Sequence, residues 1–241
     1  GREFLNGENR YCFWIVDSFN ELRNLPILQE RISQVKEMRL KSSFSDTRKL
    51  AERPYQFRDL KNPNSFVVIP ATSSENRKYI PFGFLDKNYI PSNSIYMIEN
   101  ATLFHFGILT SIMHMTWVKT ICGRLKSDYR YSKDVVYNNF PWPENPSEKH
   151  TKSIEIAAQK VLDARAEFPN SSLADLYDPL TMPPSLIKAH NELDKAVDLA
   201  YRPQAFTSEA NRMEFLFELY EKYTADLFTK EKVKKTKKTK E

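Results

Sequence analysis

The chain has 241 residues, of which 41% are hydrophobic, so it is long enough for one large domain or two ordinary ones with buried cores. Its two cysteines, Cys12 and Cys122, are too few for a disulfide scaffold, which favours a reducing, cytoplasmic setting. No run approaches the roughly eighteen apolar residues of a membrane span, and the segment GREFLNGENR has neither a signal core nor an initiator Met. These features argue against a membrane protein and a disulfide-rich secreted one, and they predict a soluble fragment of a longer chain.

The net charge of +5 is spread unevenly. Residues 1–140 hold 20 basic and 14 acidic side chains, whereas residues 141–229 hold 9 basic and 15 acidic ones. The last twelve residues, KEKVKKTKKTKE, add seven lysines and two glutamates. This asymmetry favours a nucleic-acid partner for the front of the chain. The Lys-rich segment 230–241 is expected to be disordered, either adding nonspecific attraction to phosphates or serving only as a solubilising end.

The front of the chain predicts an α/β fold. The apolar run YCFWIV (11–16) is typical of a buried strand, and the residues that follow it predict a helix over 28–40. The segments SFVVIP (65–70) and NSIYMI (93–98) are rich in Val, Ile and Tyr and predict further strands of a mixed sheet. An apolar stripe over 101–122 predicts one long buried helix.

The pattern changes at a cluster of prolines, Pro141, Pro143 and Pro146. Beyond this cluster no strand pattern is found, and three segments have the apolar spacing of amphipathic helices. These segments are SIEIAAQKVLDARAEF, PPSLIKAHNELDKAVDLAY and TSEANRMEFLFELYEKYTADLF. We therefore expect an α/β domain over residues 1–142 and an all-α helical domain over residues 143–229.

No segment carries the glycine pattern of a cofactor or nucleotide site. Glycines occur only at positions 1, 7, 83, 107 and 123, so the Gly-rich turn of a methyltransferase and the Walker motif are both absent. His105 and His114 lie nine residues apart, out of HExxH register, and His150 and His190 stand alone. The sequence thus predicts no catalytic residue, no metal site and no cofactor site in this chain.

The loop NNFPWP (138–143) has two interpretations. It resembles the Asn-Pro-Pro-aromatic loop with which amino-methyltransferases hold a target base, but no Pro follows its Asn. In the alternative, Phe140 and Trp142, held by Pro141 and Pro143, pack where the two predicted domains meet. The structural interpretation is the stronger one, because no cofactor-binding half precedes the loop.

The segment RLKSDYRYS (124–132) carries a charged side chain at every second position. In an extended chain Lys126, Asp128 and Arg130 project to the same side. Lys and Arg can donate to guanine O6 and N7 in the DNA major groove, and Asp can accept from cytosine N4. The pattern therefore fits base reading. A solvated salt-bridge strand is the alternative, and the basic front of the chain favours nucleic acid.

Four long segments resemble a known family. They are RYCFWIVD, QFRDLKNPNSFVVIPATSSENRKYIPFGFL, FGILTSIMHMTWVKTICGRLKSDYRYSKDVVYNNFPWPE and LYDPLTMPPSLIKAHNELDKAVDLAYRP. They are similar to the C-terminal target-recognition and helical domains of the MmeI-like enzymes, which are bifunctional type II restriction-modification proteins and DNA methyltransferases. The resemblance covers the whole chain except its Lys-rich end.

This resemblance implies a role for the chain and for the polypeptide around it. The chain would read a short asymmetric site in double-stranded DNA. A nuclease and an adenine-N6 methyltransferase upstream on the same polypeptide would cut and methylate, with the target adenine flipped out of the duplex. The resemblance implies S-adenosylmethionine and Mg²⁺ as the cofactors of the full-length protein, and a prokaryotic cytoplasm as its location.

The resemblance also implies individual roles. Lys126 and Asp128 would read one G·C pair, with Lys126 donating to guanine and Asp128 accepting from cytosine, and Arg130 would contribute to a neighbouring pair. Further specificity positions fall on Ala71, Asn93 and Ser94, and at Ala71 only an apolar contact is possible, such as one to a thymine methyl group. Four cations are candidate phosphate contacts, although generic surface charge explains them equally well: Arg77, Lys78, Lys119 and Arg124.

Two other functions remain open. In the first, YNNFPWP is a degenerate catalytic loop and the chain still binds S-adenosylmethionine. In the second, the aromatic-rich chain is a protein-docking module that never contacts DNA. Calorimetry with S-adenosylmethionine tests the first, and salt-dependent binding to duplex DNA counts against the second.

Overall fold

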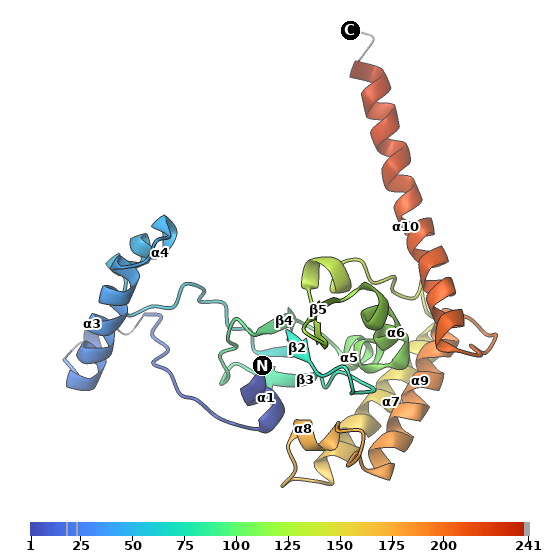
Figure 1. Ribbon diagram of the computed structural model, residues 1–241, viewed down its shortest axis with the longest axis horizontal. Coiled ribbons are helices and arrows are strands. Elements are labelled where there is room, and N and C mark those ends of the chain that lie inside the picture. The colour runs from blue at the N-terminus through green and yellow to red at the C-terminus, as the bar shows by residue number, and fades with distance from the viewer. Residues whose placement is uncertain (18, 23, 239–241) are drawn as a thin grey trace. The chain divides into compact units, whose positions relative to one another are not determined.

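The computed structural model describes residues 1–17, 19–22 and 24–238, and their side chains as far as residue 225 (Figure 1). The chain forms two compact units. One consists of Gly1–Glu8 together with the chain from Asn64 onward, and the other is Asn9–Pro63. The first unit holds the sheets and the helical C-terminal region, whereas the described residues of the second form helices and irregular chain.

The unit Asn9–Pro63 is organised around one helix. Its helices are α2 (Phe19–Leu22), α3 (Pro26–Leu40), α4 (Ser45–Lys49) and η1 (Leu50–Glu52). Pro26 opens α3 because its ring presets a helical φ. Near the other end of α3, the Arg39 guanidinium donates to the backbone carbonyls of Leu50, Arg53 and Gln56 and so holds the following turns. The predicted helix over 28–40 is confirmed.

The predicted strand over 11–16 is wrong. These residues form irregular chain, and the Tyr11 side chain is 93% exposed. The backbone groups of a strand need a neighbouring strand as a hydrogen-bond partner, and no strand is found among the described residues of this unit. An apolar run predicts that a segment tends to be buried, but it does not predict whether a neighbouring strand is available for hydrogen bonding.

Within the described residues of the first unit, six short strands form two three-stranded sheets. The strands are β1 (Ser65–Pro70), β2 (Thr72–Ser73), β3 (Gly83–Asp86), β4 (Ile95–Glu99), β5 (Gly123–Leu125) and β6 (Asp128–Arg130). The first sheet has the order β3-β1-β4 and the second has the order β2-β6-β5, with antiparallel ladders in both. The predicted strands at 65–70 and 93–98 are confirmed. Only Ala71 separates β1 from β2, so the chain passes directly from one sheet to the other.

Two helices, α5 (Leu103–Thr110) and α6 (Ile112–Ile121), occupy the range 101–122, where the sequence predicts one long helix. The interruption lies at Ser111, which has an extended backbone with φ −83° and ψ 165°. Its hydroxyl accepts a hydrogen bond from the backbone N–H of His114, so Ser111 acts as the N-cap of α6. Both helices are largely buried, as the apolar stripe predicts.

The C-terminal region is helical and packs directly on α5 and α6. Its helices are α7 (Glu148–Ala166), α8 (Leu173–Leu176), α9 (Pro184–Tyr201) and α10 (Glu209–Lys238), and the short α1 (Arg2–Asn6) lies against α8. Gly107 of α5 allows close packing on α7, because a Cβ atom at this position would lie 2.6 Å from Cγ2 of Ile154. The predicted α/β class with a helical C-terminal region is confirmed.

Buried side chains from both sides of the proline cluster form one continuous core, so the domain boundary at residue 142 stays a prediction. The expected disorder of 230–241 also stays a prediction. Helix α10 extends to Lys238, but residues 239–241 and the side chains beyond residue 225 lie outside the described residues. None of the described helices combines the length and the apolar composition needed to cross a membrane.

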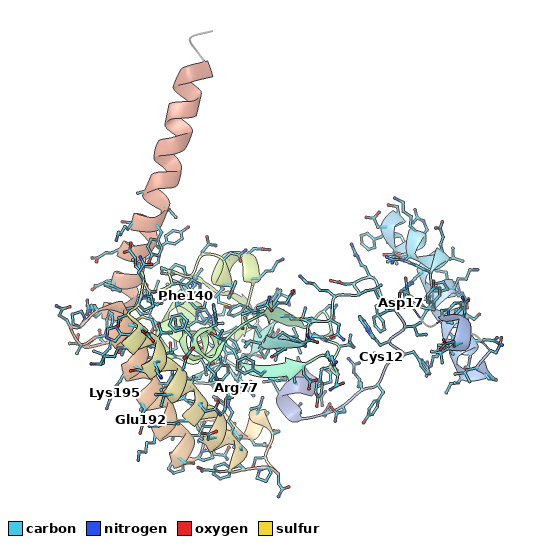
Figure 2. All side chains as sticks on the ribbon, turned by 180° about the vertical axis from the view of Figure 1, so that it is seen from behind. Cys12, Asp17, Arg77, Phe140, Glu192 and Lys195 are labelled. Carbon is cyan, nitrogen blue, oxygen red and sulfur yellow. The ribbon has the colours of Figure 1, made fainter. Side chains whose placement is uncertain are left out.

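The loop 138–143 packs by its aromatic side chains. Phe140, which is labelled in Figure 2, is buried in the core. It meets the ring of His114 edge-on, with centroids 4.6 Å apart. It also contacts Trp117 and Trp142, with centroid separations of 6.3 and 5.5 Å. These contacts fix the loop on α6.

The backbone of the same loop is held by the helical region. The carbonyl of Pro141 accepts from the Tyr201 hydroxyl of α9 at 3.0 Å, and the carbonyl of Trp142 accepts from the Tyr223 hydroxyl of α10 at 2.8 Å. The loop thus joins α6 to α9 and α10. This packing agrees with the structural interpretation of the loop.

A buried polar cluster also joins the front of the chain to the helices. The Asp194 carboxylate of α9 accepts from the Tyr79 hydroxyl and from the backbone N–H of Ile112, both at 2.7 Å. Burial raises the pKa of Asp194 to about 6. His190 stacks on Tyr79 with centroids 4.0 Å apart and shares a 2.7 Å hydrogen bond with the Tyr177 hydroxyl, and burial lowers its pKa.

Candidate nucleic-acid interface

The candidate base-reading segment is a β-hairpin. Strands β5 and β6 are joined by a two-residue turn, because Leu125 pairs directly with Asp128. Asp128 and Arg130 share one face of β6, as predicted. Lys126 stands in the turn with φ +57°, so the expectation that all three charged residues lie on one extended segment is wrong for Lys126. The chain reverses immediately after Leu125, and a sequence pattern of alternating charges does not reveal that reversal.

One face of the second sheet packs on the core. Tyr129 and Ser73 lie opposite each other in the ladder between β6 and β2 and are only 4% and 2% exposed. Across the hairpin Tyr129 pairs with Arg124, whose guanidinium lies 4.1 Å from the ring centroid. Neighbouring residues of a strand point to opposite faces, so Asp128 and Arg130 lie on the other face, called the outer face below.

The fold uses one cation of the hairpin, Arg124, and leaves the other two, Lys126 and Arg130, without side-chain partners in the described part of the chain. Among the described residues, neither Lys126 nor Arg130 has a side-chain hydrogen bond or an ion pair, and both side chains are exposed. The Asp128 carboxylate accepts one long hydrogen bond, from the Glu75 backbone N–H at 3.4 Å. The three charged groups do not pair with one another, which argues against an ordinary salt-bridge strand.

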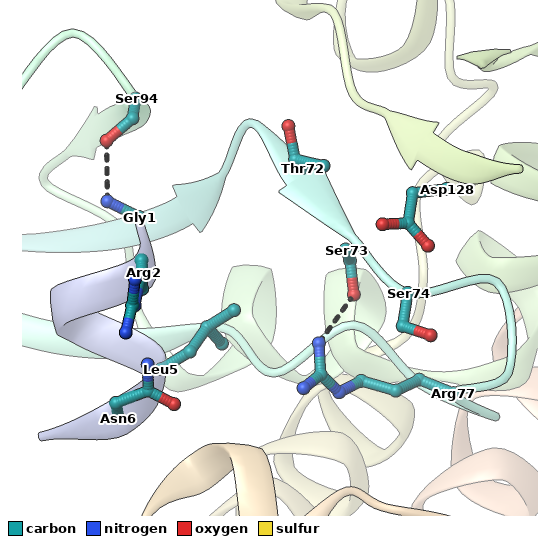
Figure 3. Close-up of a pocket in the computed structure, with 10 residues that line it drawn as sticks. All are labelled: Gly1, Arg2, Leu5, Asn6, Thr72, Ser73, Ser74, Arg77, Ser94 and Asp128. Atoms are coloured by element: carbon teal, nitrogen blue, oxygen red, sulfur yellow. Dashed lines mark hydrogen bonds between the residues drawn. The ribbon is translucent and has the colours of Figure 1, made fainter. Parts of the chain in front are cut away.

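A cleft of about 440 Å³ lies beside β2 and β6 (Figure 3). Ala71 links the chain segments around the cleft. Its N–H donates to the Ser94 carbonyl and its carbonyl accepts from the Tyr131 N–H, both at 2.9 Å. Ser94, Thr72 and Asp128 line the cleft. The fold therefore brings the predicted specificity positions at Ala71, Ser94 and Asp128, which are far apart in sequence, close to one another.

Arg77 lines the same cleft and is partly buried. Its guanidinium donates to Oγ of Ser73 at 3.5 Å, and its buried Nε has no hydrogen-bond partner among the described residues. Burial lowers the pKa of Arg77, and the nearby carboxylates of Asp128 and Asp178 partly oppose this. This environment suits a cation that steadies Asp128 better than one that lies on a phosphate, although a phosphate contact by Arg77 stays a prediction.

The other three candidate phosphate contacts differ in their surroundings. Arg124 lies 3.8 Å from the Glu75 carboxylate, and Lys119 of α6 forms a 2.7 Å ion pair with Glu209 of α10. Lys78 is exposed. Solvent-exposed pairs of this kind contribute little to stability, so they do not decide whether these cations contact phosphates. That role stays a prediction.

Sequence reasoning missed two polar residues that line the cleft, Thr72 and Ser74. Thr72 pairs with Arg130 in the ladder between β2 and β6, and Ser74, which follows the end of β2, lines the cleft beside it. No local signal marks them, because their position depends on a strand far along the chain. Asn93, which the resemblance singles out, is exposed in the loop before β4, beside the cleft residue Ser94.

His114 and His105 have structural roles. His114 is 1% exposed and shares a 3.0 Å hydrogen bond with the Tyr131 hydroxyl, and burial lowers its pKa to about 3. Nδ1 of His105 accepts from the backbone N–H of Thr102 and completes a capping box at the start of α5. Within the described part of the chain, no three His, Cys, Asp or Glu side chains gather as metal ligands.

Two family models match the chain. The model of the MmeI target recognition domain matches residues 1–144, and the model of the MmeI C-terminal domain matches residues 146–228. The chain belongs to the MmeI family. A solved structure of the type IIL restriction-modification enzyme MmeI in complex with DNA is 48% identical and superposes with a TM-score of 0.89 over 93% of this chain and 30% of that chain. The resemblance noted in the sequence is confirmed.

A curated protein is also similar in sequence to this MmeI-family chain. DNA methyltransferase A of Bacillus subtilis (strain 168) is 46% identical over 224 residues, which are 92% of this chain. The matched region is 25% of that protein, so the chain spans about a quarter of the length of its relative.

Proposed function

We propose that this chain is the sequence-reading module of an MmeI-family restriction-modification methyltransferase and that it binds double-stranded DNA. The observation that carries the proposal is the outer face of the second sheet. Asp128 and Arg130 on this face and Lys126 in the adjoining turn make almost no side-chain contacts within the fold, whereas the opposite face is anchored by Tyr129. The relative solved with DNA supports the same partner.

The chemistry of these groups suits the major groove. In the proposed arrangement the Lys126 ammonium donates to guanine O6 or N7, and the Asp128 carboxylate accepts from N4 of the paired cytosine. The forked guanidinium of Arg130 reads a neighbouring base pair. Asn93 and Ser94 offer further polar contacts, and Ala71 offers only an apolar one. The cations around the cleft position the backbone of the duplex.

The remaining parts of the proposal concern the longer polypeptide. Residues 1–142 read the DNA, and the helical residues 143–229 brace them. The methyltransferase and nuclease lie upstream on the same chain and use S-adenosylmethionine and Mg²⁺, and the protein works in a prokaryotic cytoplasm. The similarity to a DNA methyltransferase that is about four times as long supports this arrangement.

A binding-site selection tests the proposal. The full-length protein is incubated with random DNA duplexes, and the bound fraction is sequenced at several salt concentrations. We expect one short asymmetric motif, and we expect log affinity to fall linearly with log salt by about 0.9 per phosphate contact. Bound DNA without any motif would contradict sequence reading, and a lack of salt-dependent binding would favour the protein-docking alternative.

Calorimetry tests the alternative of a degenerate methyltransferase. The chain of residues 1–241 is titrated with S-adenosylmethionine. We expect no heat of binding, because the sequence has no Gly-rich turn for the cofactor. A measurable heat of binding would instead favour the alternative of a degenerate methyltransferase.

A further inference from the structure

Leu125 occupies an unusual position at the tip of the hairpin. It ends β5, immediately before the turn, and its side chain is 48% exposed. It lies directly opposite Asp128 in the ladder between β5 and β6. Residues that face each other across an antiparallel ladder project to the same face, so Leu125 shares the outer face with Asp128 and Arg130.

The hairpin itself gives no reason for a leucine here. Its cross-strand partner is a carboxylate, and an apolar side chain beside a carboxylate forms neither an ion pair nor an apolar cluster. The pair that stabilises the hairpin, Arg124 with Tyr129, lies on the opposite face. The next residue, Lys126, has a left-handed backbone that Gly or Asn would adopt with less strain. Choices that work against local stability concentrate at functional sites.

The surroundings restrict what Leu125 can contact. Asp128 faces it across the ladder, Lys126 follows it in the turn, and Arg130 lies on the same face of β6 as Asp128; all three carry groups that can hydrogen-bond to base edges. A side chain on that face without donors or acceptors can interact favourably only with an apolar group, and the only apolar group on a base edge in the major groove is the 5-methyl of thymine.

We infer that Leu125 is a further specificity-determining residue, whose side chain contacts the 5-methyl group of a thymine in a base pair adjacent to the pair read by Lys126 and Asp128. The inference rests on the proposed function and adds to it an apolar reading position that the alternating charges do not reveal.

Replacement of thymine by deoxyuridine tests the contact, because it removes the methyl group and leaves every hydrogen-bonding group of the base pair in place. The selected motif is prepared as two duplexes, one with thymine and one with deoxyuridine at the adjacent position. Affinity is measured for the full-length protein and for its Leu125→Ala and Leu199→Ala variants. Leu199 of α9 is a matched control, since it is 49% exposed and undergoes the same truncation on a helix.

We expect the unmodified protein to bind the thymine duplex about fourfold more tightly, as the burial of one methyl group implies. Leu125→Ala should bind the two duplexes equally, and Leu199→Ala should keep the fourfold preference. The inference is overturned if the motif has no thymine at either adjacent position. It is also overturned if the unmodified protein binds both duplexes equally, if Leu125→Ala keeps the preference, or if Leu199→Ala loses it.

These outcomes leave the proposed function standing, because each of them presupposes sequence-specific binding. If the selection yields no motif at all, the proposed function and the inference fail together. Both variants change exposed side chains, so folding is checked by comparing their unfolding midpoints with that of the unmodified protein.

Discussion

Two neighbouring segments of the chain, the hairpin 123–130 and the loop 138–143, differ in whether their polar side chains are hydrogen-bonded within the fold. In the loop, the Asn139 amide donates to two backbone carbonyls, those of Asp134 at 2.7 Å and Val135 at 3.1 Å. In the hairpin, Lys126 and Arg130 have no side-chain partner among the described residues. The loop resembles a catalytic motif in sequence, but its polar groups hold the fold. The hairpin lacks a catalytic motif, and the charges of Lys126 and Arg130 are available to a ligand.

The comparison shows how a functional segment can be told from a packing segment when both are rich in aromatic and polar residues. Phe140 and Tyr129 are both buried, and each anchors its segment to the core. What differs is the state of the polar groups beside the anchor. The hairpin presents charged side chains on its outer face, whereas the backbone carbonyls of the loop are bonded to tyrosines of α9 and α10.

The largest effect is expected in the loop. Phe140→Ala removes a buried ring from the contacts with His114 and Trp117 and should lower the free energy of unfolding by about 3–5 kcal/mol. Urea denaturation measures this change. Val135→Ala, at a side chain that is 48% exposed, serves as the control and should change little. A loss below about 1 kcal/mol for Phe140→Ala would show that the loop is not a packing joint.

The hairpin should show the reverse behaviour. Asp128→Ala removes an acceptor for cytosine and should reduce discrimination at one base pair by about 1–3 kcal/mol, or roughly 5- to 150-fold in relative affinity. The free energy of unfolding should change by less than about 0.5 kcal/mol, since Asp128 accepts only a long hydrogen bond at 3.4 Å. Competition binding with duplexes altered at each position measures the first quantity. Equal losses at every position would contradict direct base reading.

Acid should weaken the packing on which the loop rests. Burial lowers the pKa of His114 to about 3. Between pH 6.5 and about 3 the unfolded chain therefore binds a proton at this residue and the folded chain does not. Stability from His114 is full above pH 6.5 and should fall by about 1.4 kcal/mol for each pH unit below it, down to about pH 3. His114→Gln should reduce this slope by one proton, as measured by denaturation between pH 7 and 5.

Two other buried groups set the overall sign of the pH dependence. Burial also lowers the pKa of His190, which adds to the loss in acid. Burial raises the pKa of Asp194 to about 6, so the folded chain takes up a proton between pH 6 and about 4 that the unfolded chain does not, and this opposes the loss. Two histidines against one carboxylate predict a net loss of stability in acid. A stability that rises from pH 7 to 5 would contradict this account of the buried polar cluster.

The smallest expected effect concerns the hairpin turn. Lys126→Gly relieves a left-handed residue with φ +57° and should raise the free energy of unfolding by up to about 1 kcal/mol while it weakens base discrimination. Ser127→Gly, at the adjacent turn residue whose φ is not positive, should be slightly destabilising. Thermal melts compare the two variants. If Lys126→Gly is the less stable variant, the positive φ of Lys126 does not strain the hairpin, and it gives no reason to assign this lysine to binding.

Much of the fold is predictable from local patterns. The unbroken apolar run of β1, Pro26 at the start of α3 and the apolar stripe over 101–122 each specify an element through burial or backbone preference. The interruption at Ser111 and the irregular chain at 11–16 were not predicted. The first depends on an N-cap inside an apolar run, and the second depends on the absence of a partner strand, which no window of sequence reports.

The candidate site is predictable to a similar extent. The alternating charges identify Asp128 and Arg130, and the resemblance adds Ala71, Asn93 and Ser94. The pairing of β2 with β6, which brings Ala71 and Thr72 beside Arg130, joins segments far apart in sequence. The turn at Lys126 and the position of Leu125 opposite Asp128 likewise depend on the register between β5 and β6. A slip of one residue in this register would move each side chain to the other face of the sheet.

The central claim is that Lys126 and Asp128 read the two bases of one G·C pair. The most direct test exchanges their chemistry in the full-length protein by combining Lys126→Glu with Asp128→Arg, and then maps the selected or methylated motif of the double variant. The claim predicts that one position changes from G·C to C·G while the other positions stay the same. A motif that keeps its original base at that position would contradict it.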